Sequence, residues 1–289
     1  MLPYRIYLSG GGICAMAHVG ALIELSKHIP LQAVKEWMGV SAGSLVAMCL
    51  CIGFTLEELL AFSVRFDFTE IKEMDSVPGW ILHCGMDTGE RLHRLIQACL
   101  HVKGCNSEFT FQECLTKYGI SLRIIATDVN DAAPIIFSPS TTPSYPIADA
   151  VRASMSFPYY FQPFICPESG HYLVDGAVIS NHPLFVLPTE EHSRTLSILI
   201  RTFIEKKECD AEMAINEFMM RPLSIALSEK NKIESRSYDA RCIQIMLGEV
   251  DILDFSMEDD VKRVIIQKGK DAVIQFMGQH KPQRRHSIS

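Results

Sequence analysis

The chain has 289 residues, of which 48% are hydrophobic and 21% charged, so a sizeable core is possible and global disorder is disfavoured. Its formal net charge of −7 argues against a general nucleic-acid-binding protein, which needs a basic face. Ten cysteines are spread along the chain, and no two of them form a C-x-x-C pair. This spacing argues against a zinc site and against a small disulfide-rich domain. We therefore predict reduced core cysteines and, because residues 1–5 lack the apolar stretch of a signal peptide, a cytoplasmic protein.

The first part of the chain alternates strand-like and helix-like segments. The expected strands are 5–8 and 36–40, and the expected helices are 16–28, 44–53 and 55–66. This order, with a glycine loop after the first strand, favours a parallel sheet with helices on both faces. The uncharged stretch 38–54 is close to the lower length limit of a membrane span, but its glycines and serines favour a buried strand end and helix.

The rest of the chain is expected to form one domain with the first part. Residues 66–89 are irregular, and Trp80 with nearby aliphatic side chains suits a lid, a membrane-facing loop or an ordinary partly buried loop. Beyond it we expect helices at 89–100, 147–154, 212–238 and 257–277, and strands at 121–127, 135–137, 172–174, 196–200 and 242–246. The predicted domain is 1–278, with a motif core at 5–185, C-terminal strand and helices at 195–278 and a flexible tail at 279–289.

The pentapeptide Gly39-Val40-Ser41-Ala42-Gly43 is a G-x-S-x-G sequence between two apolar runs. A nucleophile elbow needs this context, in which a strand ends, the backbone turns sharply and a helix begins with the serine at the tip. One strand–helix unit upstream, Gly10-Gly11-Gly12 precedes a helix N-terminus, where backbone N–H groups can stabilise an oxyanion. Alone, this glycine run is also compatible with a phosphate loop or a tight turn.

The general base is less clear from the pattern. Candidate histidines late in the chain include His171, His182, His192 and His280. An apolar strand also delivers Asp175 directly before Gly176, at the edge where open α/β sheets place their sites. An isolated Asp-Gly pair is more often a turn, so the residues alone leave both types of base open.

Taken in order, these motifs resemble the patatin-like phospholipase family over nearly the whole chain. The glycine loop and the elbow are followed by segments similar to the family's Thr-Asp, Arg-Ala-Ser-x-Ser-x-Pro and Asp-Gly-Ala motifs. These segments are 126–128, 152–158 and 175–177, followed by Asn181 and Pro183. The resemblance implies a three-layer α/β/α sandwich with a mostly parallel central sheet.

The resemblance also implies a phospholipase A-type lipid acyl hydrolase. Ser41 is then the nucleophile of an acyl-enzyme mechanism and Asp175 the base, without a histidine. The implied oxyanion hole is formed by Gly10, Gly11, Gly12 and Ile13. No metal or cofactor is implied, and the partners are a phospholipid or other acyl lipid and transiently a membrane surface, with no nucleic acid.

One departure from the family pattern concerns the oxyanion loop. The family usually has a basic residue and then glycine where this chain has Cys14 and Ala15. Backbone donors survive these changes, but the positive side chain is lost. Two alternatives therefore stand beside the hydrolase: an acyltransferase or thioesterase using the same dyad, and a catalytically weakened lipid-binding module. Cys14 itself has no base motif that would make it a nucleophile.

Overall fold

The computed structural model describes residues 2–204, 215–235 and 241–279. Its centre is an eight-stranded sheet of order β10-β9-β1-β2-β4-β8-β7, with β5 also paired to β4. Five strands run parallel: β1 (Arg5–Leu8), β2 (Glu36–Val40), β4 (Ser121–Asp128), β9 (Thr195–Phe203) and β10 (Cys242–Glu249). Three strands are antiparallel to their neighbours: β5 (Ala133–Phe137), β7 (Phe164–Ile165) and β8 (Tyr172–Asp175). The expected mostly parallel sheet is confirmed.

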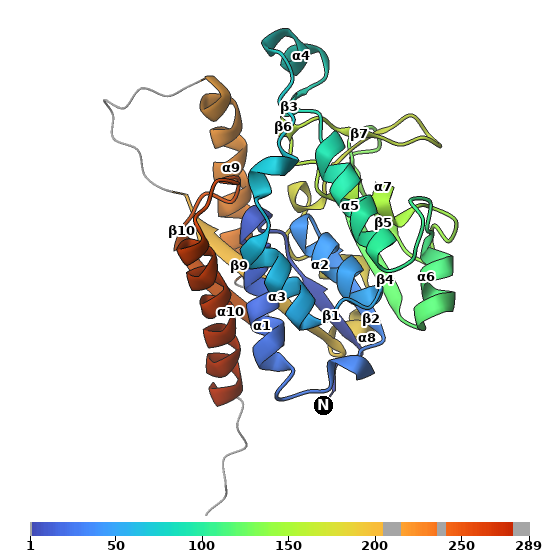
Figure 1. The fold of residues 1–289 in the computed structure, drawn as a ribbon, viewed down its shortest axis with the longest axis vertical. Helices are drawn as coiled ribbons and strands as arrows, with labels where there is room; N and C mark the ends of the chain where they lie inside the picture. The colour runs from blue at the N-terminus through green and yellow to red at the C-terminus, as the bar shows by residue number, and fades with distance from the viewer. Residues whose placement is uncertain (1, 205–214, 236–240, 280–289) are drawn as a thin grey trace, which may run out of the picture.

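Helices flank this sheet (Figure 1). They are α1 (Met16–Leu25), α2 (Ala42–Cys51), α3 (Leu56–Arg65), α4 (Val77–Leu82), α5 (Glu90–Val102), α6 (Phe111–Tyr118), α7 (Ile147–Ser154), α8 (Thr189–His192), α9 (Ile215–Glu234) and α10 (Asp259–Gln279). Short 3₁₀ turns are η1 (Gly12–Ala15), η2 (Leu31–Ala33), η3 (Phe68–Ile71), η4 (Gly176–Val178) and η5 (Leu184–Val186). A separate small sheet pairs β3 (Gly85–Asp87) with β6 (Tyr159–Phe161).

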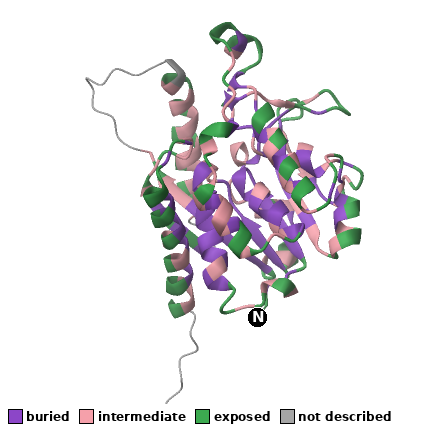
Figure 2. Cartoon of the chain, viewed as in Figure 1, coloured by how far each residue is buried: buried purple, intermediate pink, exposed green. Residues whose placement is uncertain are grey.

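Alternate residues of the central strands pack into two different cores, as the pleat of a strand requires. Ile6 and Leu8 of β1 belong to the large core beneath α1, α2 and α10, whereas Tyr7 belongs to a smaller cluster on the opposite face. Residues of η5 and the adjoining Leu187 cover that second face. Figure 2 shows the strands as the most continuously buried part of the chain. The sheet therefore holds its strand ends, and any side chains on them, in fixed positions.

The structure also differs from the sequence-based expectations in detail. Helix α6 and the short helix α4 were not anticipated, and α1 ends at Leu25 rather than at residue 28. The predicted helix 212–238 is seen as α9, and its two predicted ends lie outside the described residues. The tail predicted at 279–289 lies outside them as well, except for Gln279, the last residue of α10. In the described ranges, no helix has both the length and the hydropathy that a membrane span requires.

Candidate active site

Ser41 lies on a sharp turn between β2 and α2. Its backbone has a conformation that residues other than glycine rarely adopt. Its φ is 53° and its ψ is −136°, outside the regions open to most L-residues. The flanking glycines permit the turn: a Cβ on Gly39 would lie 2.6 Å from the carbonyl oxygen of Gly43, and one on Gly43 would lie 2.4 Å from the carbonyl oxygen of Leu8. These contacts are those of a nucleophile elbow.

Other side chains fix the elbow in place. The Ser154 hydroxyl accepts a hydrogen bond from the Ser41 N–H at 2.9 Å and donates one to the Ile125 carbonyl oxygen at 2.6 Å. The Ser44 hydroxyl donates to the carbonyl oxygen of Ser41 at 2.5 Å. Ser154 belongs to the Arg-Ala-Ser-x-Ser-x-Pro segment at 152–158, and these contacts give that segment a physical role. It ties the strained turn to strand β4.

The strand register brings Asp175 to the serine. β2 runs parallel to β4 and its last residue, Val40, is paired with Ile125. β8 runs antiparallel to β4, and its last residue, Asp175, is paired with the next residue, Ala126. Because β5 occupies the other side of β4, β2 and β8 lie on the same side and their carboxyl ends meet.

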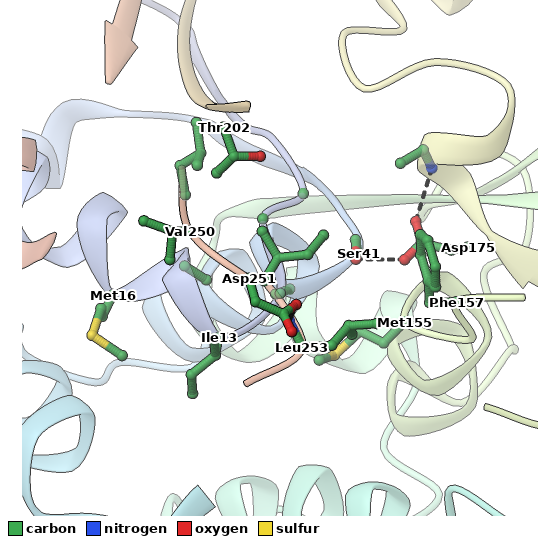
Figure 3. A pocket seen from close by; sticks show the side chains of 18 of the residues that line it. Ile13, Met16, Ser41, Met155, Phe157, Asp175, Thr202, Val250, Asp251 and Leu253 are labelled. Carbon is green, nitrogen blue, oxygen red and sulfur yellow. Dashed lines mark hydrogen bonds between the residues drawn. The ribbon is translucent and has the colours of Figure 1, made fainter. Parts of the chain in front are cut away.

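At this meeting point the Ser41 hydroxyl donates a hydrogen bond to Oδ2 of Asp175 at 2.5 Å (Figure 3). The other carboxylate oxygen, Oδ1, accepts the N–H of Ala177 at 2.8 Å. Burial raises the pKa of Asp175 to about 6, opposed by the hydrogen bonds from Ser41 and Ala177 and by the charge of Lys230. A carboxylate with this pKa is a stronger base than an exposed one and is still ionised at neutral pH.

The glycine loop lies against this pair, but its four candidate donors are not equivalent. The Gly10 N–H donates to Oδ1 of Asn181 at 2.7 Å, and the Ile13 N–H donates to the carbonyl oxygen of Ile252 at 2.9 Å. For the N–H groups of Gly11 and Gly12, no acceptor is recorded within the described ranges. Of the four N–H groups expected to form the oxyanion hole, those of Gly10 and Ile13 thus already bind acceptors within the protein.

Cys14, at the position where the family usually has a basic residue, is completely buried. Burial, followed by the negative charges of Asp251 and Asp254, raises the pKa of its thiol to about 12, while Lys268 lowers it. A thiol with that pKa is protonated at neutral pH and is a poor nucleophile. The structure therefore places Cys14 in the core beside the glycine loop.

A cavity of about 620 Å³ opens at the Ser41–Asp175 pair. This volume is in the usual range of small-molecule sites, roughly 300–1,000 Å³. Its walls come from the glycine loop, α2, α3, α5, α9 and the segment after β10. Figure 3 shows Met155 and Phe157 near the Ser41–Asp175 pair, and Ile13 further away beside Met16. The apolar side chains of its lining include Val46, Leu59, Phe62, Ile71, Leu92 and Phe161. Such a cavity accommodates a long apolar group whose polar end lies at Ser41.

The candidate histidines within the described residues lie in other contacts. The His182 ring shares a hydrogen bond of 2.8 Å with the hydroxyl of Ser197 on β9. His171 is paired with Asp128 at 2.9 Å, and together with Asp131 these residues place potential ligand atoms within 4.8 Å of one another. Asp128 also accepts the N–H groups of Asn130 and Asp131, so its contacts are explained by a loop turn without a metal.

A strained serine turn at the carboxyl end of a parallel sheet, with a buried carboxylate beside it and a cavity next to it, is the arrangement of a hydrolase built on a mixed α/β fold. The pattern of the patatin-like phospholipases matches residues 6–188, more than half of the chain, and the chain belongs to this family. This membership supports a lipid hydrolase activity in general terms.

Several individual proteins are similar to this chain. An uncharacterised protein of Acanthamoeba polyphaga mimivirus is 29% identical over 94% of this chain and 92% of its own length. A probable lipid hydrolase of Invertebrate iridescent virus 6 is 25% identical over 62% of this chain and 61% of its own length. Among solved structures, VipD of Legionella pneumophila superposes with a TM-score of 0.66 over 97% of this chain and 67% of its own, at 16% identity. At that identity the likeness concerns the fold.

Proposed function

We propose that this protein is a phospholipase A-type lipid acyl hydrolase in which Ser41 is the nucleophile and Asp175 the general base. The observation that carries the proposal is the 2.5 Å hydrogen bond between these two side chains in the lining of the apolar cavity. The family supports lipid hydrolysis. The cavity supports a long acyl chain as the group that is bound, because its lining is mainly apolar.

The proposed reaction proceeds in two steps. In the first, Asp175 takes the proton of the Ser41 hydroxyl while Oγ attacks the ester carbonyl carbon, and the N–H groups of Gly11 and Gly12 stabilise the oxyanion. The tetrahedral intermediate then collapses to an acyl-serine, and the leaving alcohol receives the proton from Asp175. In the second step Asp175 takes a proton from water, the resulting hydroxide attacks the acyl-serine, and Ser41 regains its proton as the fatty acid leaves.

The test uses a fluorophosphonate probe and a lipid-product profile. Labelling that is lost in Ser41→Ala supports an activated serine, and equal labelling of that variant contradicts it. Incubation with phospholipid, triacylglycerol and acyl-CoA separates the proposed activity from a thioesterase or acyltransferase: released fatty acid and lysophospholipid support the proposal. We expect Ser41→Ala and Asp175→Asn to lose the activity and His182→Ala to keep it, and loss only in the histidine variant would exclude the dyad.

We also propose that the protein meets its substrate at a membrane surface through α4. Figure 1 shows α4 projecting beyond the rest of the molecule, and in Figure 2 this projection is largely exposed. Three of its apolar side chains, those of Val77, Ile81 and Leu82, are between 60% and 79% exposed. Apolar side chains on a projecting segment gain free energy by entering the interfacial region of a bilayer.

A further inference from the structure

Lys230, on α9, makes three hydrogen bonds to the backbone that follows Asp175. Its Nζ donates to the carbonyl oxygens of Ala177 at 3.1 Å, Val178 at 2.8 Å and Ile179 at 2.6 Å. An ammonium group has three protons, so these contacts use its full capacity. A lysine on the surface does not ordinarily bind three consecutive carbonyl groups, so this contact is a specific link between α9 and the backbone after Asp175.

The backbone after Asp175 presents carbonyl groups at the end of a short helical turn, where a positive charge is stabilising. Residues Gly176–Val178 form the 3₁₀ turn η4, and the N–H groups of Ile179 and Ser180 both donate back to the carbonyl oxygen of Gly176. The next three carbonyl groups in the chain are the ones that Lys230 binds. Carbonyl groups at the end of a helical turn carry partial negative charge, and a positive side chain stabilises them.

The turn is also the support of the carboxylate. Oδ1 of Asp175 accepts the N–H of Ala177, the first residue whose carbonyl group Lys230 binds. One turn further along α9, Oε2 of Glu234 accepts the Ser180 hydroxyl at 3.2 Å. Both α9 residues lie beyond residues 6–188, which carry the family pattern. Helix α9 therefore holds the aspartate segment from outside the motif region.

We propose that Lys230 is a positioning residue of the Ser41–Asp175 pair: by binding the carbonyl groups of residues 177–179, it fixes the turn that holds the Asp175 carboxylate and couples α9 to the catalytic site. This inference rests on the proposed function, in which Asp175 is the base. It predicts that the reaction rate depends on Lys230 even though its side chain contacts backbone carbonyl groups and not Ser41.

The positive charge of Lys230 also favours the ionised form of Asp175, which is the form that acts as the base. The pKa of Asp175 is raised mainly by burial and is lowered in part by the positive charge of Lys230. The pKa of Lys230 is lowered by burial and raised by Glu234 and Asp175. Within the described residues, the groups acting on Asp175 are thus the Ser41 hydroxyl, the Ala177 N–H and Lys230, with Glu234 acting on the lysine. Removal of Lys230 leaves the carboxylate with less stabilisation.

The experiment measures the rate of fluorophosphonate reaction with Ser41 from pH 5 to 9 in the full chain. In Lys230→Met we expect the acid limb of the profile to move to higher pH, with a rate loss of about tenfold at pH 6 and about threefold at pH 8.5. Lys230→Arg keeps the charge but not the compact three-carbonyl contact, so its acid limb stays near that of the wild type and its plateau falls. Lys27→Met, which removes an exposed lysine charge on the segment after α1, is the matched control and keeps the wild-type profile.

A second readout does not depend on activity. With ¹³C-labelled aspartate, the carboxyl resonance of Asp175 is identified by its absence in Asp175→Asn, and its titration is compared in the wild type and Lys230→Met. A shift to higher pH supports the inference, and superimposable titrations and rate profiles overturn it. If Lys230→Met does not fold, Lys230→Gln, which keeps a donor without the charge, carries both measurements. A wild type that the probe does not label contradicts the proposed function, while the resonance still reports on Lys230.

Discussion

Asn181 and Gly10 are joined across 171 positions of the sequence: Oδ1 of Asn181 accepts the Gly10 N–H at 2.7 Å. The backbone carbonyl oxygen of Asn181 in turn accepts a hydrogen bond from the Tyr7 hydroxyl at 2.9 Å, so the backbone of this residue is tied to β1. This contact connects the segment after Asp175 to the glycine loop. The Asn181 side chain therefore directly links the segment that follows the proposed base to the loop that carries the proposed oxyanion donors.

Replacement of Asn181 by alanine is expected to slow the acylation of Ser41 by about 10- to 100-fold, because the glycine loop loses its tie to the aspartate segment. The fluorophosphonate labelling rate of Ser41 measures this effect without the need for a lipid substrate. Asn106→Ala, which changes an exposed asparagine in the turn before α6, is the matched control. Equal rates in the two variants would show that the Asn181–Gly10 contact does not position the loop.

A part of the site could be predicted from the sequence where it depends on residues close together in the chain, and not where it depends on contacts between distant segments. The strands β1 and β2 and the elbow are local features: an apolar run, two glycines and one serine in five positions. Their bounds in the structure, Arg5–Leu8 and Glu36–Val40, agree with the prediction. Helix α6 carried a local signal that was overlooked, since Thr110 and Glu113 form a capping box at its start.

The distance between Ser41 and Asp175 has no local signal, because it depends on the registers of β2 and β8 on the shared neighbour β4. The engagement of the Ile13 N–H by Ile252 likewise joins distant parts of the chain. The residues alone indicate Asp175 as one of several candidate bases, and the family resemblance selects it as the partner of Ser41. The role proposed for Lys230 could not be predicted from a local pattern or from the family resemblance. A single lysine in a helix has no distinctive pattern, and Lys230 lies outside the residues that match the family.

The raised pKa of Asp175 predicts that Asp175→Asn stabilises the fold at neutral pH. Because the folded protein binds the proton more tightly than the unfolded chain does, the group's contribution to stability is full below about pH 4 and is lost as the pH rises through about 6. A shift of this size, about two pKa units, corresponds to about 3 kcal/mol. Asparagine carries no charge and can still accept the Ala177 N–H.

Urea unfolding of wild type and Asp175→Asn at pH 7.5 and pH 4 checks this prediction. The variant should be more stable by about 2–3 kcal/mol at pH 7.5, and the difference should shrink at pH 4. An equal difference at both pH values would mean that the ionisation of Asp175 does not cause it. Loss of activity with a gain in stability is the pattern expected when a buried charge is kept for catalysis.

The buried thiol of Cys14 is expected to take no part in catalysis. With a pKa of about 12 it is protonated at neutral pH, so Cys14→Ser should label with fluorophosphonate within about threefold of the wild type. Iodoacetamide at pH 8, followed by mass spectrometry of the folded protein, should modify the exposed Cys84 and leave Cys14 unmodified. If Cys14→Ser instead lost labelling as completely as Ser41→Ala, the thiol would belong to the active site.

The projecting apolar side chains of α4 are expected to govern binding to lipid vesicles. Ile81 and Leu82 are 79% and 75% exposed, so their transfer into a bilayer interface removes apolar surface from water without breaking contacts in the core. Each side chain contributes up to about 1.5–3 kcal/mol when fully buried, so Ile81→Asp should weaken vesicle binding by about tenfold or more. Sedimentation with phosphatidylcholine vesicles measures the bound fraction.

Val102→Asp provides the comparison for this variant, because Val102 is 70% exposed but lies at the far end of α5. We expect it to bind vesicles like the wild type. Hydrolysis of a soluble short-chain ester should be equal in both variants, since neither position lines the cavity at Ser41. If Ile81→Asp sedimented with vesicles as the wild type does, α4 would not be the membrane-contacting segment; if it lost the soluble-ester activity as well, the substitution would have disturbed the site itself.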